Sequence, residues 1–165
     1  MEPSVSKMEE KKLIGVMIST SMKDGKQKDE IPPFFHKVYD EKTLDIIKNR
    51  KDSNQYCVFR FKENGQDFDY IIAAEVNDFS EIPENMVSMT LPSNEYVKLP
   101  FIKRGNKDGL AAFGFILNDW LPKSGYSQLK APAFIYYDER FFSVFDKVGY
   151  NGEPIGELNI PITKK

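Results

Sequence analysis

The sequence predicts an α+β fold in which duplicated strand-helix-strand-strand units form an antiparallel sheet with two main helices and a central ligand cleft. The first observation is that hydrophobic patterns follow one another in the same order in two halves, about residues 12–80 and 86–163. The second is length, because 165 residues suit one domain or two small, closely packed halves. The third is a similar junction after each helix, which indicates a duplicated unit: Asp45 through Tyr56 to Phe61, and Asp119 through Tyr126 to Phe141.

The first half follows a charged stretch, residues 1–11, which we expect to be a flexible lead-in. Residues 12–20 alternate and predict a strand that is covered on both faces, and residues 22–30 form a charged connection. Pro32 and Pro33 are tolerated in a first helical turn. The spacing of Phe35, Val38 and Tyr39 then predicts a helix.

The first half ends with a predicted hairpin. Residues 56–62 and 69–76 alternate as strands do, and an Asn64-Gly65 pair typical of tight turns lies between them. We therefore expect the two strands to pair in antiparallel fashion.

The second half opens with residues 87–101, a strand interrupted near Pro92 and Ser93. A helix follows, because Leu110, Phe113, Leu117 and Trp120 or Leu121 recur at the spacing of one helical face, and Pro122 ends the run. An apolar, aromatic strand over residues 133–139 and a last strand around residues 156–163 complete the half.

Composition and charge argue against several classes of protein. A net charge of -2 and a pI near 5.6 give no basic surface for nucleic acid. One cysteine, Cys57, and one histidine, His36, supply neither a disulfide framework nor a metal site, and the glycines do not form a nucleotide-binding fingerprint. No apolar run approaches the ~20 residues that span a bilayer, and the first dozen residues lack the apolar core of a secretory signal. We expect a soluble cytoplasmic protein without metal or cofactor, and with neither nucleic acid nor membrane as a direct partner.

The strand over residues 133–139 ends in two tyrosines and two carboxylates, which makes it a candidate binding site. Desolvation beside aromatic rings would raise the pKa of Glu139 unless a cationic ligand compensated it, so such a carboxylate would select cations. The ring faces of Trp120 and Tyr137 would add cation–π attraction of roughly 0.5–2 kcal/mol each. The alternative is that Asp138 and Glu139 both face solvent, and spacing alone favours this alternative.

Two other glutamates occupy unusual positions. Glu75 lies in the apolar run of residues 71–76, on the face of Ile71 and Ala73, so it is either at a frayed strand end or directed into a cavity. Glu157 is placed similarly, just before the last strand. Small residues nearby would leave room for a ligand between sheet and helix, although they serve close packing equally well.

Four segments of the chain resemble the GyrI-like small-molecule-binding domains, a multidrug-binding family also called effector-binding domains of AraC type. The segments are FDYIIAAEVNDFSEIPENM, LNDWLPKSGY, APAFIYYDERF and GELNIPI, in the family's order, and the resemblance runs from about Ile14 to Ile162. The family implies a duplicated strand-helix-strand-strand unit, eight antiparallel strands, two helices, and a central cleft that binds hydrophobic, often cationic compounds. That arrangement agrees with the halves predicted above.

The resemblance also implies which residues line the cleft. Trp120 comes from the NDWLPKSGY motif, Tyr137 and Glu139 come from YYDERF, and Phe113 lies on the helix that carries Trp120. Phe35, from the IPPFF helix start, and Glu75, from the AAEV strand, are further candidates.

The chain departs from the family at one position. Relatives often carry an acidic residue just after the Phe of this strand, where this chain has Ile135 after Phe134. If that residue is the ligand-binding glutamate, then Glu139, Glu75 or Glu157 would have to replace it.

Three functions remain as hypotheses. The first is a non-enzymatic module that captures a hydrophobic, flat or cationic molecule in an aromatic cleft with a glutamate. The second is a hydrolase of cyclopropanoid or other reactive toxins, as some relatives are, with Glu139 or Glu75 as general acid or base and Tyr137 orienting water. The third is a protein partner, as in gyrase-inhibitor relatives, which a large exposed apolar patch would favour. Because no helix-turn-helix fits before Leu13 or after Ile162, we expect a stand-alone domain without a DNA-binding part.

Overall fold

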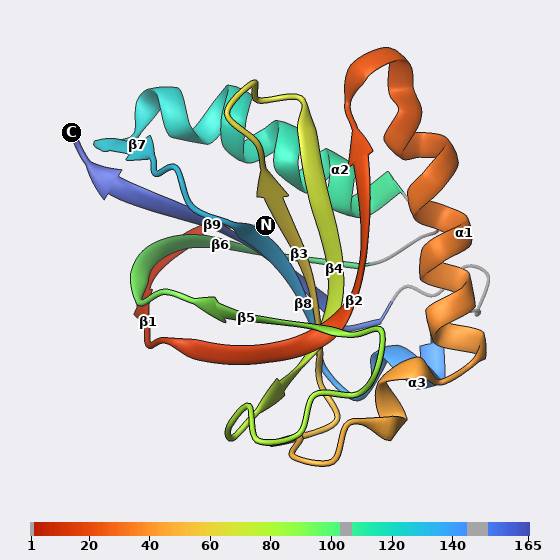
Figure 1. Ribbon diagram of the computed structural model, residues 1–165. Coiled ribbons are helices and arrows are strands. Elements are labelled where there is room, and N and C mark those ends of the chain that lie inside the picture. Colours follow the sequence, from red (N-terminus) through yellow and green to blue (C-terminus); the bar gives the residue numbers. More distant parts are fainter. Residues whose placement is uncertain (1, 103–106, 145–151) are drawn as a thin grey trace. The chain divides into compact units, whose positions relative to one another are not determined.

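The computed structural model describes residues 2–102, 107–144 and 152–165, and the chain divides into two units (Figure 1). The first unit comprises residues 10–91, and the second comprises residues 1–9 together with 92–165. The strand pairs described within the units are antiparallel, and each unit contains one main helix. The predicted α+β class, with antiparallel strands and two main helices, is therefore confirmed.

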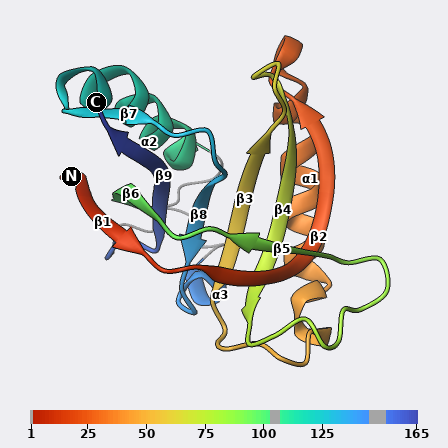
Figure 2. The ribbon, with the colours of Figure 1, turned by 60° about the vertical axis from the view of Figure 1, so that its left-hand side comes forward.

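In the first unit, strands pair in the order β3-β4-β2-β5, and a helix covers one face of the sheet. The elements are β2 (Lys11–Ser21), η1 (Lys23–Gly25), α1 (Lys26–Asp40), η2 (Thr43–Ile46), β3 (Gln55–Phe61), β4 (Asp67–Val76) and β5 (Val87–Leu91). Figure 2 shows α1 running along β2 and β4. The ring of Tyr70 in β4 lies 6.2 Å from that of Phe34 in α1. Because side chains alternate across a strand, Asp69 and Glu75 belong to the opposite face of the sheet.

The predicted hairpin is confirmed. β3 and β4 pair with Arg60 opposite Asp69 and Tyr56 opposite Ala73. Gly65 has a positive φ of 71°, a conformation that glycine adopts without steric cost.

Helix α1 begins earlier than the sequence predicted. Gly25 precedes it with a φ of 70°, and the helix already includes Lys26 to Glu30, which were expected to be a connection. An i, i+4 ion pair between Lys26 and Glu30 supports this solvated turn. Pro32 and Pro33 consequently lie inside the helix instead of in its first turn, and its buried residues are Phe35 and Val38.

The second unit has the strand order β1-β6-β9-β8, and a short further strand, β7, also pairs with β9. The strands are β1 (Ser4–Met8), β6 (Asn94–Phe101), β7 (Tyr126–Gln128), β8 (Ala133–Tyr137) and β9 (Gly156–Lys164). The helical segments are α2 (Lys107–Gly114), the π-helical η3 (Phe115–Trp120), η4 (Leu121–Lys123) and α3 (Phe141–Val144).

The two units share one strand order, β3-β4-β2-β5 in the first and β8-β9-β6-β1 in the second. Neither β1 nor β5 pairs with the strand that follows it along the chain, although each pairs within its own unit. β1 precedes β2 along the chain but pairs with β6, whereas β5 precedes β6 but pairs with β2.

The prediction of a flexible lead-in over residues 1–11 is therefore wrong, because residues 4–8 form strand β1. Val5 lies opposite Val97 and Met8 lies opposite Asn94 in its ladder with β6. The pairing satisfies backbone groups of β6 that would otherwise form an open strand edge.

The helical stripe predicted for the second half differs from the buried face of α2. Ala112 and Ile116 are buried, whereas Leu110 is 57% exposed. A Cβ on Gly109 would lie 3.2 Å from Ile135 Cδ1, so small residues allow α2 to pack closely on the sheet. The wider π-helical turn of η3 also shifts the register of the side chains that follow.

The five largest fully buried side chains are aromatic: Tyr96, Phe68, Phe101, Phe134 and Phe141. The high phenylalanine content therefore serves core packing to a large extent. Within the described ranges, no helix is long and apolar enough to cross a membrane.

Candidate functional site

Glu75 is a buried carboxylate near the end of β4 in the first unit. The residue is 6% exposed, although its neighbours Ala73, Ala74 and Val76 make the strand apolar. It pairs with Leu13 of β2, on the sheet face opposite α1. The sequence left open whether Glu75 lies at a frayed strand end or is directed into a cavity. The structure shows that its side chain is buried and that the strand end is not frayed.

Three side chains from three segments hold the Glu75 carboxylate. The Tyr56 hydroxyl of β3 donates to Oε1 at 3.4 Å, and Lys11 Nζ of β2 lies 3.5 Å from the same oxygen. Lys51, between η2 and β3, places its Nζ 3.5 Å from Oε2. The Lys51 backbone N–H also donates to the Glu75 carbonyl oxygen at 2.9 Å, which fixes this segment beside the end of β4.

A pocket of about 340 Å³ opens at this carboxylate. It is lined by Glu10, Lys12, Lys51, Glu75, Val76 and Asn77, all of the first unit. Its volume falls within the usual range for small-molecule sites, roughly 300–1,000 Å³. The Glu75 carboxylate that lines this pocket is paired with the ammonium groups of Lys11 and Lys51.

The other predicted glutamates lie in the second unit and are more accessible. Glu139 is exposed just after β8. Its neighbour Asp138 accepts from Arg140 Nη2 at 2.7 Å, and this hydrogen bond holds the pKa of Asp138 below its usual value. Glu157 is half-buried in β9 and accepts from Asn159 Nδ2 at 3.3 Å. Of these three glutamates, Glu75 is the most buried.

The predicted aromatic residues of the second unit have ring partners within that unit. Tyr137, 3% exposed, packs against Phe101 and Phe141, with ring centroids 6.2 Å and 4.6 Å away. Trp120 is half-buried and stacks on Tyr126 at 6.1 Å, with an angle of 15° between the ring planes.

The two remaining aromatic candidates lie on helices. Phe113 is half-buried on α2, and Phe35 is buried in α1 of the first unit. The structure thus assigns Phe35 and Glu75 to the first unit, and Trp120, Tyr137, Glu139 and Phe113 to the second.

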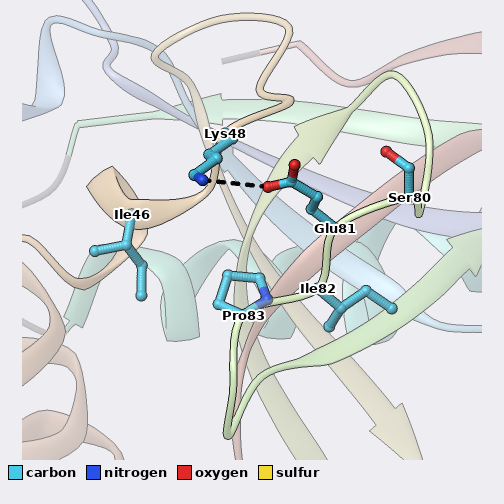
Figure 3. Close-up of a pocket in the computed structure, with 6 residues that line it drawn as sticks. All are labelled: Ile46, Lys48, Ser80, Glu81, Ile82 and Pro83. Carbon is cyan, nitrogen blue, oxygen red and sulfur yellow. Dashed lines mark ion pairs between the residues drawn. The ribbon is translucent and has the colours of Figure 1, made fainter.

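A second pocket of the first unit, about 440 Å³ in volume, lies between η2 and the loop after β4 (Figure 3). It is lined by Ile46, Lys48, Ser80, Glu81, Ile82 and Pro83. Lys48 Nζ lies 3.5 Å from Glu81 Oε2, and both side chains are strongly exposed. Water therefore already solvates this ion pair, and the pocket lacks a buried charge of the kind found at Glu75.

Sequence reasoning did not identify Tyr56, Lys11 and Lys51 as partners of Glu75. The register of the hairpin contained a signal for Tyr56, since a turn at Asn64-Gly65 places Tyr56 opposite Ala73, on the face of Glu75. The two lysines approach from other segments, and no local pattern marks them.

In the part of the chain that the structure describes, no group of three or more His, Cys, Asp or Glu side chains could hold a metal ion.

The chain folds as a small α+β domain with antiparallel strand pairs in each unit. Residues 4–162 match the family described as integron-associated effector binding protein (Cass2), and the chain belongs to this family. The resemblance to GyrI-like effector-binding domains inferred from the four segments is confirmed. No curated protein matches the sequence.

Solved structures share the fold at low sequence identity. SAV2435 bound to tetraphenylphosphonium is 16% identical, with a TM-score of 0.77, over 99% of this chain and 94% of that one. An integron cassette protein of Vibrio cholerae is 14% identical, with a TM-score of 0.60, over 98% and 95% of the two chains. EcmrR in a complex with DNA is 16% identical, with a TM-score of 0.64, over 99% of this chain and 58% of EcmrR. At these identities the likeness establishes the fold.

Proposed function

We propose that this protein binds small hydrophobic cations and that Glu75 provides the negative charge that holds them. The observation that carries the proposal is Glu75 itself, a carboxylate 6% exposed that lines a pocket of about 340 Å³. Its family is described as effector-binding, and the solved relative SAV2435 is bound to the hydrophobic cation tetraphenylphosphonium.

Two physical terms favour a cation of this kind. Burying its apolar surface contributes ~25 cal/mol per Å² before the costs of association. The Glu75 carboxylate is already largely withdrawn from water, so a cation that replaces one of its two lysine partners gains attraction without a large further desolvation cost. A hydrophobic anion of the same shape would gain the first term but not the second.

The test is a calorimetric titration of the whole protein with tetraphenylphosphonium. Binding is expected for the wild type, and Glu75→Gln should weaken it at least about tenfold, since loss of one charge contact is worth ~1.4 kcal/mol or more. Glu81→Gln, which removes an exposed carboxylate of the other pocket, should leave the affinity within about twofold.

The remaining glutamates complete the experiment. If Glu139→Gln or Glu157→Gln weakens binding while Glu75→Gln does not, the ligand is held in the second unit and the assignment to Glu75 is wrong. If the wild type binds neither tetraphenylphosphonium nor other hydrophobic cations, the proposed function itself fails.

A further inference from the structure

We infer that Lys51 is a resident counter-ion of Glu75, so that the site works by cation exchange: the ligand cation enters as the Lys51 ammonium group leaves. The inference rests on the proposed function, because it assumes that a cation is held at Glu75. In this scheme Lys51 neutralises Glu75 until a ligand binds, and the competition between Lys51 and the ligand determines which cations bind.

The two lysines on Glu75 lie on different sides of the carboxylate. Lys51 lines the pocket and contacts Oε2, whereas Lys11 and Tyr56 contact Oε1 and are not part of the lining. A ligand in the pocket therefore meets both the carboxylate and the Lys51 ammonium group that pairs with it. Lys11 and Tyr56 would keep Glu75 in place while the partner on Oε2 changes.

Lys51 is also the partner that can leave at low cost. Its side chain is 49% exposed, against 23% for Lys11, so its ammonium group returns to water over a short path. Its backbone is held by the hydrogen bond to the Glu75 carbonyl oxygen, so only the side chain has to move. Rotamer changes of exposed side chains occur within nanoseconds.

The other charged groups of the lining are less suited to this role. Lys12 places its Nζ 5.9 Å from the ring centroid of Phe79, and Glu10 is exposed and carries the opposite charge. Among the described residues that line the pocket, Lys51 is thus the cation paired with Glu75.

Exchange of this kind sets the selectivity of the site. Hydrated cations such as Na⁺ or ammonium would have to give up water and gain no apolar contact, so they compete poorly with a tethered ammonium group. A large, weakly hydrated organic cation gives up little water and also buries apolar surface against Val76, the apolar residue of the lining. The site would therefore admit hydrophobic cations and resist the common inorganic ones.

The test compares variants of the full chain by calorimetric titration with tetraphenylphosphonium. Lys51→Met keeps the aliphatic stem and removes the competing charge, so it should bind about three- to tenfold more tightly than wild type. Lys51→Arg restores a cation and should return the affinity to within about twofold of wild type. Lys48→Met, which removes an exposed lysine of the neighbouring pocket, serves as the matched control and should bind as wild type does.

A parallel titration uses tetraphenylborate, an anion of the same shape. Tighter cation binding by Lys51→Met, together with unchanged or weaker anion binding, supports the exchange. If Lys51→Met binds tetraphenylphosphonium no better than wild type, the inference is overturned, even where loss of binding in Glu75→Gln upholds the proposed function. If Glu75→Gln leaves cation binding intact, the proposed role of Glu75 and the exchange at Lys51 are both wrong. Circular dichroism of each variant, with Lys51→Gln as a second neutral form, excludes misfolding as the cause.

Discussion

Asp69 is a second buried carboxylate on the face of the first sheet opposite α1, and it is fully paired. The residue is 4% exposed. Ser19 Oγ donates to Oδ1 at 2.8 Å, while Arg60 Nη2 and Lys62 Nζ lie 3.0 Å and 3.3 Å from Oδ2. Burial raises the pKa of Asp69, but the hydrogen bonds from Ser19, Arg60 and Lys62 lower it further, so the net pKa lies below its usual value.

Replacing Asp69 by Asn is expected to lower the free energy of unfolding by about 2 kcal/mol near neutral pH, because a buried charge network loses its centre. A carboxyl group with a lowered folded-state pKa stabilises the fold fully above its unfolded pKa, ~3.9, and this stabilisation is lost as the pH falls through the folded value. Urea unfolding of both chains near neutral pH and near pH 3 should therefore show the difference shrinking in acid.

The control for this prediction is Glu63→Gln, an exposed change in the turn of the same hairpin, which should alter stability by less than about 0.5 kcal/mol. A difference between Asp69→Asn and wild type that is as large in acid as at neutral pH would show that the effect comes from packing and not from the charge.

At single positions, the sequence identifies the unusual residue Glu75 better than it identifies the lysines that pair with it. Glu75 stands out because a charge interrupts an apolar strand, and its burial agrees with one of the two interpretations given. Lys11 and Lys51 do not stand out, because lysines are common on surfaces and these two reach Glu75 from 64 and 24 residues away in sequence, as the difference in numbering shows. Partners at that separation are determined by strand register and chain path.

Gly15 of strand β2 lies so close to the backbone of β4 that there is no room for a side chain. A Cβ on Gly15 would clash with the Ile72 carbonyl oxygen and lie 2.6 Å from Ala73 Cα of β4. Both are backbone atoms, so no side chain can move aside to relieve the clash. Gly15 also lies where β2 pairs with β4 on one side and with Val87 of β5 on the other.

Gly15→Ala is therefore expected to destabilise the protein by about 2–4 kcal/mol, since β2 and β4 would have to separate locally. Thermal and urea unfolding measure the effect. Gly125→Ala is the matched control, because a Cβ there meets nothing within 4 Å, and it should change stability by less than about 0.5 kcal/mol. Equal stability of the two variants would mean that the close approach of β2 and β4 is not required.

Element types were predicted more reliably than element boundaries and buried faces. Strand-type runs bounded by turn residues located the β3–β4 hairpin, and Pro92-Ser93 marked the break between β5 and β6. Hydrophobic patterns could not locate the start of α1, whose first turn is held by solvated charges. They also misjudged α2, because Ala112 is buried by close approach to the sheet and not by hydrophobicity.

For the whole molecule, duplication was predictable from the repeated order of elements. The pairing of β1 with β6 and of β5 with β2 was not predictable. β1 is short, with Ser4, Ser6 and Lys7 exposed, and its partner β6 begins 86 residues beyond its end, from Met8 to Asn94. A strand this short and polar gives no local hydrophobic signal. Its structure depends on the edge that β6 offers, which is a property of the assembled second unit.

Because β1 pairs with β6 and not with β2, we predict that β1 need not be covalently joined to β2. A chain lacking residues 1–9 should lose about 2 kcal/mol or more of stability, because the ladder between β1 and β6 is removed and β6 becomes an edge. Moving residues 1–9 behind Lys165, through a linker of about 12 Gly and Ser residues that spans roughly 20 Å, should restore most of that loss. Such a path is short, since β9, β6 and β1 are neighbours in one sheet.

Urea unfolding of the wild-type, shortened and rearranged chains tests this prediction, with Val5→Pro in the rearranged chain as its control. Proline at this position, opposite Val97, disrupts the ladder and should return the rearranged chain to the stability of the shortened one. If the rearranged chain stays as unstable as the shortened one, β1 stabilises the protein through its covalent link to β2 and not through β6. If the shortened chain loses no stability, the pairing of β1 with β6 contributes nothing to the fold.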